Sequence, residues 1–351
     1  KLCFNFLNNS VYFSCMTLKP FTKSTIFCFL LLLVACSKKN SNSGNTGNNG
    51  GTGGNPTGQL YEYVVSPSTT NSAITSFDNP HYVSFDTRIS AKNKLFIFLP
   101  GTSGFPSVYS LIVKKAAALG YHAMGLMYPN GSEIYVASGN NPDNTSFGRC
   151  RQEIFDGSDQ TMAIAVNPDN SIRGRLTKLL QYLQVTYPTQ NWGQYLVNGQ
   201  IDWSKCILAG HSQGGGHAVY ISKKVSLHKA LCFASIDWNS FLGTSAAWIF
   251  EPGATPASKV YSFISPNDQV FNYANVQRQL NDLGIPGAAI SIDNATPPYS
   301  STNRLTTSAT AAITLLLPDH NITCLDQYIP KTPQGAVASA FDNAWTYLIN
   351  N

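Results

Sequence analysis

The chain has 351 residues, of which 43% are hydrophobic and 12% are charged, a composition typical of a globular protein with a sizeable core. The formal charge of +5 comes from five lysines before residue 60, where no acidic residue occurs, so the remaining 18 basic and 18 acidic residues balance. This neutral balance, without a basic stripe, excludes nucleic acid as an expected partner.

The first forty residues carry the features of an export signal. Residues 26–36, IFCFLLLLVAC, form an apolar run of eleven, shorter than the roughly 20 residues that a membrane-spanning helix needs. With Lys19 and Lys23 before it, the run fits the apolar part of a secretory signal that starts at Met16, after an upstream extension. The final LVAC resembles the lipobox of bacterial lipoproteins, which implies lipidation of Cys36 and a membrane partner through that lipid. The alternatives are an ordinary signal peptide or a buried apolar helix.

Residues 37–59 form a polar tether between this signal and the folded part of the chain. They are mainly Gly, Asn, Ser and Thr, and contain no apolar residue larger than proline. Such a segment cannot bury a core and is expected to be disordered, with a reach of roughly 25 Å. The sequence thus predicts an exported, lipid-anchored protein of the bacterial cell envelope whose folded domain covers residues 60–351.

From residue 60 onward, apolar strand-like runs alternate with helical patterns. The segment 60–90 is expected to add antiparallel edge strands, and helices are expected at 106–119, 171–187, after Ser212 and at 335–349. Further strands are expected at 94–99, 122–128, 206–210, 230–235, 259–265 and 288–293. Apolar strands joined by crossover helices predict an α/β fold with a mostly parallel central sheet and helices on both faces.

Residues 205–217, KCILAGHSQGGGH, place Ser212 between an apolar strand and a helix. This is the context of the G-x-S-x-G nucleophile elbow, in which the serine occupies a tight turn and glycines two positions away avoid clashes. Gly210 and Gly214 stand at those two positions. The turn would project the hydroxyl above the carboxyl edge of the sheet, with the helix N-terminus facing a developing oxyanion. Ser212 is therefore the predicted nucleophile, against the alternative of an ordinary glycine-rich loop.

A serine nucleophile needs a general base and an acid that orients the base, and this motif has the chain order serine, acid, histidine. His320, in a loop beyond the last strand, is the predicted base. Asp268 follows the second strand after the elbow and is the predicted acid, with Asp237, one strand earlier, as its rival. Three other residues are weaker candidates: His228, Asp293 and Asp319.

The oxyanion of an acyl-transfer reaction needs two backbone N–H donors. Gln213, directly after the nucleophile, is expected to supply one of them. The other is expected from the first strand–helix loop, LPGTSGFP at 99–106, with Thr102 as the donor and Ser103 as the alternative. The same two side chains could instead cap the following helix.

With these residues in order, the chain resembles the α/β-hydrolase superfamily over roughly residues 90–350. More narrowly, it is similar to a group of secreted bacterial α/β-hydrolases. The shared features are GRCRQEIFDG at 148–157, IDWSKCILAGHSQGGGHA at 201–218, DHN at 319–321 and a WTYLI ending. The resemblance implies the fold and a serine hydrolase, and it implies no substrate. The chain departs from the lipase pattern because no histidine precedes Gly101.

Several other side chains allow two interpretations. The charged segment 148–159 either positions a polar or anionic substrate or, as we expect, forms an ion-pair network that braces a long loop. His217 is expected to be buried and hydrogen-bonded rather than catalytic, and His211 is expected to support the nucleophile. Three aromatic residues between two strands either wall an acyl or aromatic pocket or simply pack: Trp238, Phe241 and Trp248. Because that insertion is short, we expect an open cleft.

Four cysteines remain after export. Cys206 and Cys232 lie in apolar strand-like runs and are expected to be buried thiols. Cys150 and Cys324 are expected in polar loops, which favours a disulfide between them in an exported protein. No cysteine or histidine spacing suits zinc, and the predicted chemistry needs no cofactor.

Together these residues predict an exported serine hydrolase that cleaves carboxylic esters through an acyl-enzyme. A peptidase, a thioesterase or a polyester depolymerase would use the same site. A non-catalytic binding lipoprotein on the same fold is the alternative of a different class. The complete set of Ser212, His320 and Asp268 favours the enzyme.

Overall fold

The computed structural model describes residues 58–351. The predicted signal segment, Cys36 and the tether up to residue 57 lie outside these residues, so the lipid anchor stays a prediction. Within the described part, no helix is both long enough and apolar enough to cross a membrane.

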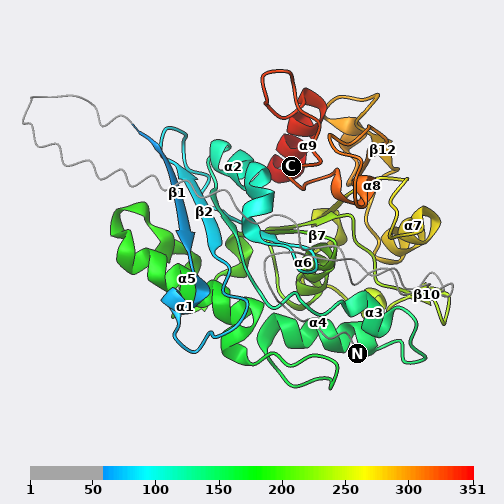
Figure 1. Ribbon diagram of the computed structural model, residues 1–351, viewed down its shortest axis with the longest axis horizontal. Helices are drawn as coiled ribbons and strands as arrows, with labels where there is room; N and C mark the ends of the chain where they lie inside the picture. Colours follow the sequence, from blue (N-terminus) through cyan, green and yellow to red (C-terminus); the bar gives the residue numbers. More distant parts are fainter. Residues whose placement is uncertain (1–57) are drawn as a thin grey trace, which may run out of the picture. The chain divides into compact units, whose positions relative to one another are not determined.

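A nine-stranded sheet forms the centre of the domain (Figure 1), with the order β1-β2-β4-β3-β7-β8-β11-β13-β12. Its strands are β1 (Leu60–Val65), β2 (His81–Asp86), β3 (Leu95–Leu99), β4 (His122–Gly125), β7 (Cys206–His211), β8 (Lys229–Phe233), β11 (Val260–Ile264), β12 (Ile290–Ser291) and β13 (Arg304–Thr306). The pairs β1–β2 and β2–β4 are antiparallel, and every further pair from β4 to β12 is parallel. The antiparallel edge and the mostly parallel sheet are as expected. Two short hairpins lie outside the sheet: β5 (Leu196–Val197) with β6 (Gln200–Ile201), and β9 (Trp238–Asn239) with β10 (Thr244–Ser245).

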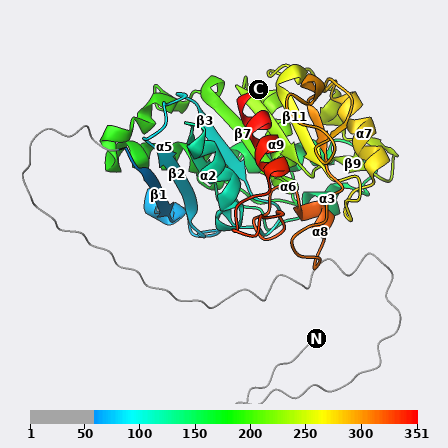
Figure 2. The ribbon, with the colours of Figure 1, turned by 90° about the horizontal axis from the view of Figure 1, so that it is seen from above.

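Helices cover both faces of the sheet. The helices are α1 (Pro67–Thr70), α2 (Ser110–Ala118), α3 (Ile134–Ser138), α4 (Ser146–Asp156), α5 (Ile172–Thr186), α6 (Gln213–Lys224), α7 (Tyr273–Asp282), α8 (Pro318–Asn321) and α9 (Ser339–Asn350). Apolar residues of α4, α5, α6 and α7 join one core cluster, whereas those of α2 and α9 join another, and both α2 and α9 lie over one face in Figure 2. On β3, alternate residues of LFIFL enter the two clusters, so every position of this strand has to be apolar. The predicted α/β architecture, a mostly parallel central sheet with helices on both faces, is confirmed.

Some elements differ from the sequence-based expectation. The segment 148–159, expected to be a braced loop, mostly belongs to helix α4, whose buried Phe147, Cys150 and Ile154 recur at helical spacing among charged residues. Strand β13 and helix α7 have no counterpart in the prediction. Both are polar in sequence, and a three-residue strand is too short for its alternation to show.

The predicted disulfide between Cys150 and Cys324 is wrong. All four cysteines of the described residues are buried free thiols, as expected for Cys206 and Cys232. Cys150 belongs to the core cluster on one face of the sheet, and Cys324 belongs to the cluster on the other face. The sheet therefore separates the two sulfur atoms.

Candidate active site

Ser212 lies in the turn between β7 and α6, with φ 51° and ψ −120°. A positive φ is uncommon for a residue that carries a side chain, and such backbone strain is concentrated at functional sites. The N–H of Ser212 donates to the carbonyl of Phe233 at 2.8 Å, which fixes the turn against the end of β8.

The glycines on either side of Ser212 allow backbone segments to approach closely. A Cβ atom on Gly210 would lie 2.3 Å from the carbonyl carbon of Gly214. A Cβ atom on Gly214 would lie 2.1 Å from the carbonyl oxygen of Leu99. Both distances are far inside van der Waals contact, so a larger residue would push α6 away from the ends of β3 and β7.

His320 and Asp268 form a hydrogen-bonded pair at the carboxyl edge of the sheet. Asp268 follows β11, and His320 lies on the short helix α8 rather than in a loop. His320 Nδ1 is 2.8 Å from Asp268 Oδ2, and both side chains are almost completely buried. The other carboxylate oxygen, Oδ1, accepts the N–H groups of Val270 at 2.7 Å and Phe271 at 3.1 Å. The carboxylate is therefore held at both oxygens and faces the imidazole.

Gln269, for which the sequence offers no motif, holds α8 beside this carboxylate. Its Oε1 accepts the N–H groups of Asp319 and His320, both at 3.1 Å. Its Nε2 donates to Asp319 Oδ2 at 2.5 Å. Asp319, one of the weaker candidates for the acid, thus binds Gln269 instead of the imidazole.

Asp237, the rival acid, belongs to a buried ion pair. Arg151 binds it through two nitrogens, with Nη2 2.6 Å from Oδ1, and Trp248 Nε1 donates to Oδ2 at 2.9 Å. Both charged side chains are nearly inaccessible to solvent. A Cβ atom on Gly216 would lie 1.9 Å from Arg151 Nη2, so this glycine leaves space for the guanidinium. An ion pair was expected in the segment 148–159, and Arg151 forms one. Arg151 lies on helix α4, however, and not in a loop.

Within the described residues, the two remaining candidates form no hydrogen bond with the imidazole of His320. Asp293 accepts the hydroxyl of Thr307 at 2.6 Å and the N–H of Ser308 at 2.7 Å. His228 lies just before β8, and its N–H donates to the carbonyl of Cys206, the first residue of β7. His228 therefore lies at the amino edge of the sheet, opposite Ser212.

Thr102 and Gln213, the predicted oxyanion donors, are adjacent. Thr102 Oγ1 donates to Gln213 Oε1 at 3.1 Å, and neither backbone N–H makes a hydrogen bond within residues 58–351. The alternative donor is already occupied, because the N–H of Ser103 donates to the carbonyl of Asn130 at 3.0 Å. The helix-capping alternative also fails, since the short 3₁₀ helix Pro106–Tyr109, which precedes α2, has Phe105 at its N-cap and no side-chain cap.

Asn130, a buried residue after β4, holds the loop that carries Thr102. Its Nδ2 donates to the carbonyls of Gly101 at 2.7 Å and Gly104 at 2.9 Å. Tyr128 adds a hydrogen bond from its hydroxyl to the carbonyl of Pro100 at 2.8 Å. The only sequence signal for Asn130 is its place after a parallel strand, at the same edge as the elbow.

His211 connects this loop with the helix that carries His320. Its Nε2 lies 3.0 Å from the carbonyl oxygen of His320, and its Nδ1 lies 3.0 Å from the hydroxyl of Tyr109. That hydroxyl oxygen accepts the N–H of Gly101 at 3.2 Å. Burial lowers the pKa of His211 to about 3, so the ring is neutral at pH 7. Its Nε2–H then donates to the carbonyl, and its Nδ1 accepts the tyrosine proton.

The imidazole of His320 lies beside the residue that precedes the nucleophile. Its ring centroid is 4.8 Å from that of His211. Among residues 58–351, no hydrogen bond joins Ser212 Oγ to His320 Nε2. Hydrogen bonds between catalytic groups are often long in a free enzyme and shorten when substrate binds.

Two further expectations can be compared with the structure. His217 is fully buried, as expected. Neither of its ring nitrogens has a hydrogen-bond partner within the described residues, so the expectation that it is hydrogen-bonded is wrong. Burial, with the nearby charge of Arg151, lowers the pKa of His217 well below its usual value and keeps the ring neutral. Trp238 and Trp248 are buried in the core, whereas Phe241 is 60% exposed in the turn between β9 and β10.

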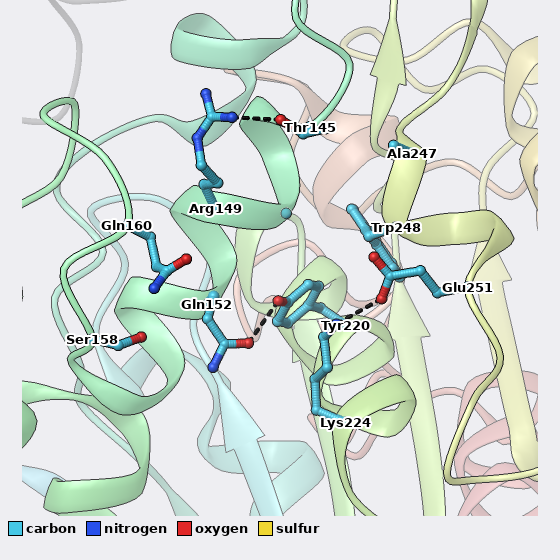
Figure 3. A pocket seen from close by; sticks show the side chains of 11 residues that line it. Thr145, Arg149, Gln152, Ser158, Gln160, Tyr220, Lys224, Ala247, Trp248 and Glu251 are labelled. Carbon is cyan, nitrogen blue, oxygen red and sulfur yellow. Dashed lines mark hydrogen bonds and ion pairs between the residues drawn. The ribbon is translucent and has the colours of Figure 1, made fainter.

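A cleft of about 420 Å³ lies elsewhere on the domain (Figure 3). It is bordered by α4, the C-terminal half of α6 and the segment around Trp248, and Tyr220 donates to Gln152 Oε1 at 2.7 Å. Lys224 and Glu251 at its border form an ion pair at 2.6 Å. Tyr220 lies eight residues after the nucleophile, about 12 Å along the helix axis. The cleft contains none of the predicted catalytic or oxyanion residues, but part of the segment 148–159 and Trp248 line it.

Comparisons with known proteins find similarity to this chain only in the course of the backbone. No protein-family model matches the chain, and no curated protein matches it. A similar solved structure is a crystal structure provisionally described as a dienelactone hydrolase from Klebsiella pneumoniae subsp. pneumoniae MGH 78578. The identity is 11%, the similarity covers 83% of this chain and 99% of that chain, and the TM-score is 0.43. At this level of similarity, the reaction of that protein says nothing about the substrate of this chain.

Proposed function

We propose that the protein is a serine hydrolase that cleaves carboxylic esters. Ser212 attacks the ester carbonyl, while His320 Nε2 accepts its proton and later gives that proton to the leaving alcohol. Asp268, bound to Nδ1, keeps the ring in the required tautomer and stabilises the imidazolium. Water, deprotonated by the same imidazole, then attacks the acyl-enzyme and releases the acid and free Ser212.

The negative charge that develops on the ester oxygen needs donors that are already in place. The side chains of Thr102 and Gln213 are in contact, and the backbone N–H groups of both residues have no partner within the described residues, which suits this role. Gln213 is also the first residue of α6, where the helix dipole favours negative charge. Asn130 and His211 would position these groups without touching the substrate.

One observation supports the proposal most strongly. Ser212 has a positive φ, and the residue before it, His211, is hydrogen-bonded to the backbone of His320. The ring of His320 is in turn paired with the buried carboxylate of Asp268. A buried histidine–aspartate pair with a purely structural role would not require the strained serine beside it.

Hydrolysis of p-nitrophenyl acetate tests the proposal. Ser212→Ala is expected to lower kcat by at least about 10⁴-fold, and the exposed Ser226→Ala, on the same segment of chain, is expected to leave kcat unchanged. A p-nitroanilide and a thioester of the same acyl group separate an esterase from a peptidase and a thioesterase. A folded wild type that turns over none of these substrates would favour the non-catalytic binding protein.

We also propose that the chain is exported and anchored to a membrane through lipid on Cys36. The supporting features are the apolar run at 26–36 and the polar segment 37–59 after it. Labelled palmitate should be incorporated by the wild type and by Cys28→Ser but not by Cys36→Ser, and processing should be sensitive to globomycin. An unlipidated, soluble product would refute the anchor and leave the hydrolase proposal intact.

A further inference from the structure

Exposed apolar side chains occur on several of the segments that follow strands at the carboxyl edge of the sheet. We define the apolar rim as Tyr135, Val136, Phe241, Leu242, Leu315 and Leu316, whose exposed fractions range from 36% to 72%. These residues follow β4, β8 and β13, and Ser212 follows β7. Because these four strands run in the same direction, the loops after them lie at one edge. The rim therefore shares its edge with the candidate catalytic residues.

Helix α3 brings the rim into contact with the site. The N–H of Ile134, its first residue, donates to Gln213 Oε1 at 3.3 Å, next to the nucleophile. The ring of Tyr135 packs edge-on against Phe271 at 5.6 Å, and Phe271 packs edge-on against His320 at 5.4 Å. A single aromatic ring thus separates Tyr135 from the imidazole.

The turn between β9 and β10 continues this surface beyond α3. The N–H of Ser240 donates to the carbonyl of Gly139, at the end of α3, at 2.6 Å. Asn239 Oδ1 accepts the N–H groups of Phe241 at 3.1 Å and Leu242 at 3.2 Å. The turn is thus fixed through its backbone, while both apolar side chains remain exposed. Figure 2 shows α3, α8 and the region of β9 on the same side of the molecule.

The segment before α8 supplies the third part of the rim. Leu316 and Leu317 have φ values of 49° and 59°, a left-handed conformation that is rare for bulky side chains. The carbonyl of Leu316 accepts Asn321 Nδ2 at 2.9 Å and the hydroxyl of Tyr328 at 3.0 Å. These bonds hold the strained backbone, and the side chain of Leu315 is 72% exposed. Exposed leucines on a strained, fixed segment next to the base point to a function rather than to packing.

The rim also lacks charge. The segments 134–142, 240–250 and 305–317 contain no Asp, Glu, Lys or Arg, although such residues make up 12% of the chain. An acidic or phosphorylated substrate would find no counter-ion on these segments. Exposed apolar side chains that cluster in this way are typical of surfaces that bind a ligand.

We propose that the apolar rim binds the acyl chain of the substrate, and that the preferred substrates are esters of long, uncharged acyl groups. This inference rests on the proposed ester hydrolase. Tyr135 of the rim is connected to His320 through the buried ring of Phe271, so an acyl chain that leaves the carbonyl at Ser212 would reach the rim at Tyr135.

The ratio of kcat/KM for p-nitrophenyl octanoate to that for p-nitrophenyl acetate tests the rim. The wild type should prefer octanoate, and Phe241→Ser combined with Leu315→Ser should lower kcat/KM for octanoate about tenfold, mainly through KM. That loss corresponds to about two buried methylene groups. Turnover of acetate should stay within about twofold, because this short acyl group does not reach the rim. The matched control is Val185→Ser, which is 81% exposed near the end of α5 and does not belong to the apolar rim.

The outcomes separate this inference from the proposed function. A wild type that hydrolyses no ester would refute the proposed ester hydrolase itself. Turnover of acetate with no preference for octanoate, or a preference that the double variant retains, would refute the rim alone. If the double variant also loses acetate turnover, the two single variants decide by the same ratio. A dimeric wild type whose double variant becomes monomeric, with the octanoate-to-acetate ratio unchanged, would make the rim an interface between copies and would overturn the proposal.

Discussion

The two candidate acids predict opposite effects when each is changed to asparagine. In Asp268→Asn, the amide oxygen can still accept the N–H groups of Val270 and Phe271. The amide NH₂ then faces His320 Nδ1, which has to become an acceptor. The proton of the ring moves to Nε2, and this nitrogen can no longer accept the proton of the serine. We therefore expect kcat to fall by about 10⁴-fold, or about 5 kcal/mol in the activation barrier, with little loss of folding stability.

Asp237→Asn removes one partner of a buried ion pair. It leaves the guanidinium of Arg151 without its counter-charge in a site that is almost closed to solvent. Breaking such a pair by removing one partner costs about 3–5 kcal/mol of unfolding free energy. For a domain of this size, that corresponds to a melting temperature roughly 5–8 °C lower. Because Asp237 does not contact His320, kcat should stay within about threefold of the wild type.

The assay combines kcat for p-nitrophenyl acetate with thermal melting for both variants, and the temperature for kcat is set below both transitions. The expected pattern is an inactive, stable Asp268→Asn and an active, less stable Asp237→Asn. The reverse pattern would transfer the role of the acid to Asp237 and refute the reasoning from the hydrogen bonds.

Three further predictions concern the surroundings of the site. Asn130→Ala should lower kcat about 10- to 100-fold with little change in KM, because it releases the loop that carries Thr102. Steady-state kinetics that show only a higher KM would contradict this prediction. Gly216→Ala should lower the free energy of unfolding, measured by chemical denaturation, by about 1–3 kcal/mol, because the added Cβ would lie 1.9 Å from Arg151 Nη2. An unchanged midpoint of the denaturation curve would show that the guanidinium can move away. Burial lowers the pKa of His81 and His211 from 6.5 to about 3, so only the unfolded state gains these protons as the pH falls below 6.5. Stability should then decrease between about pH 6.5 and pH 3, by up to about 1.4 kcal/mol per pH unit for each histidine, and a melting temperature that is equal at pH 7 and pH 5 would contradict it.

The fold follows from the sequence because its strongest signals are local. A run such as LFIFL, apolar at every position, reports a strand buried on both faces, and the glycines around Ser212 report a turn where backbones nearly touch. Helix α4 is not evident from the sequence because its polar face contains charged residues that also occur in loops. The pairing of Cys150 with Cys324 fails for a different reason, since the face of the sheet on which a residue lies depends on helices far away in sequence.

The arrangement around the candidate site can be predicted only in part. Chain order suggests Ser212, Asp268 and His320, because the motif itself defines their sequence. The choice between Asp268 and Asp237 needs coordinates, since both follow parallel strands at the same edge. The supporting residues Asn130 and Gln269 act through hydrogen bonds to backbone groups of other segments, and no local pattern marks such contacts.

Covalent labelling of Ser212 by a fluorophosphonate tests the central claim most directly, because only an activated serine reacts rapidly with this probe. Intact-mass measurement of the wild type should show one adduct per chain, and peptide mapping should place it on Ser212. Ser212→Ala should remain unlabelled, and His320→Ala should react far more slowly. A wild type that stays unlabelled, or an adduct on another residue, would contradict the proposal that Ser212, His320 and Asp268 act together as a catalytic triad.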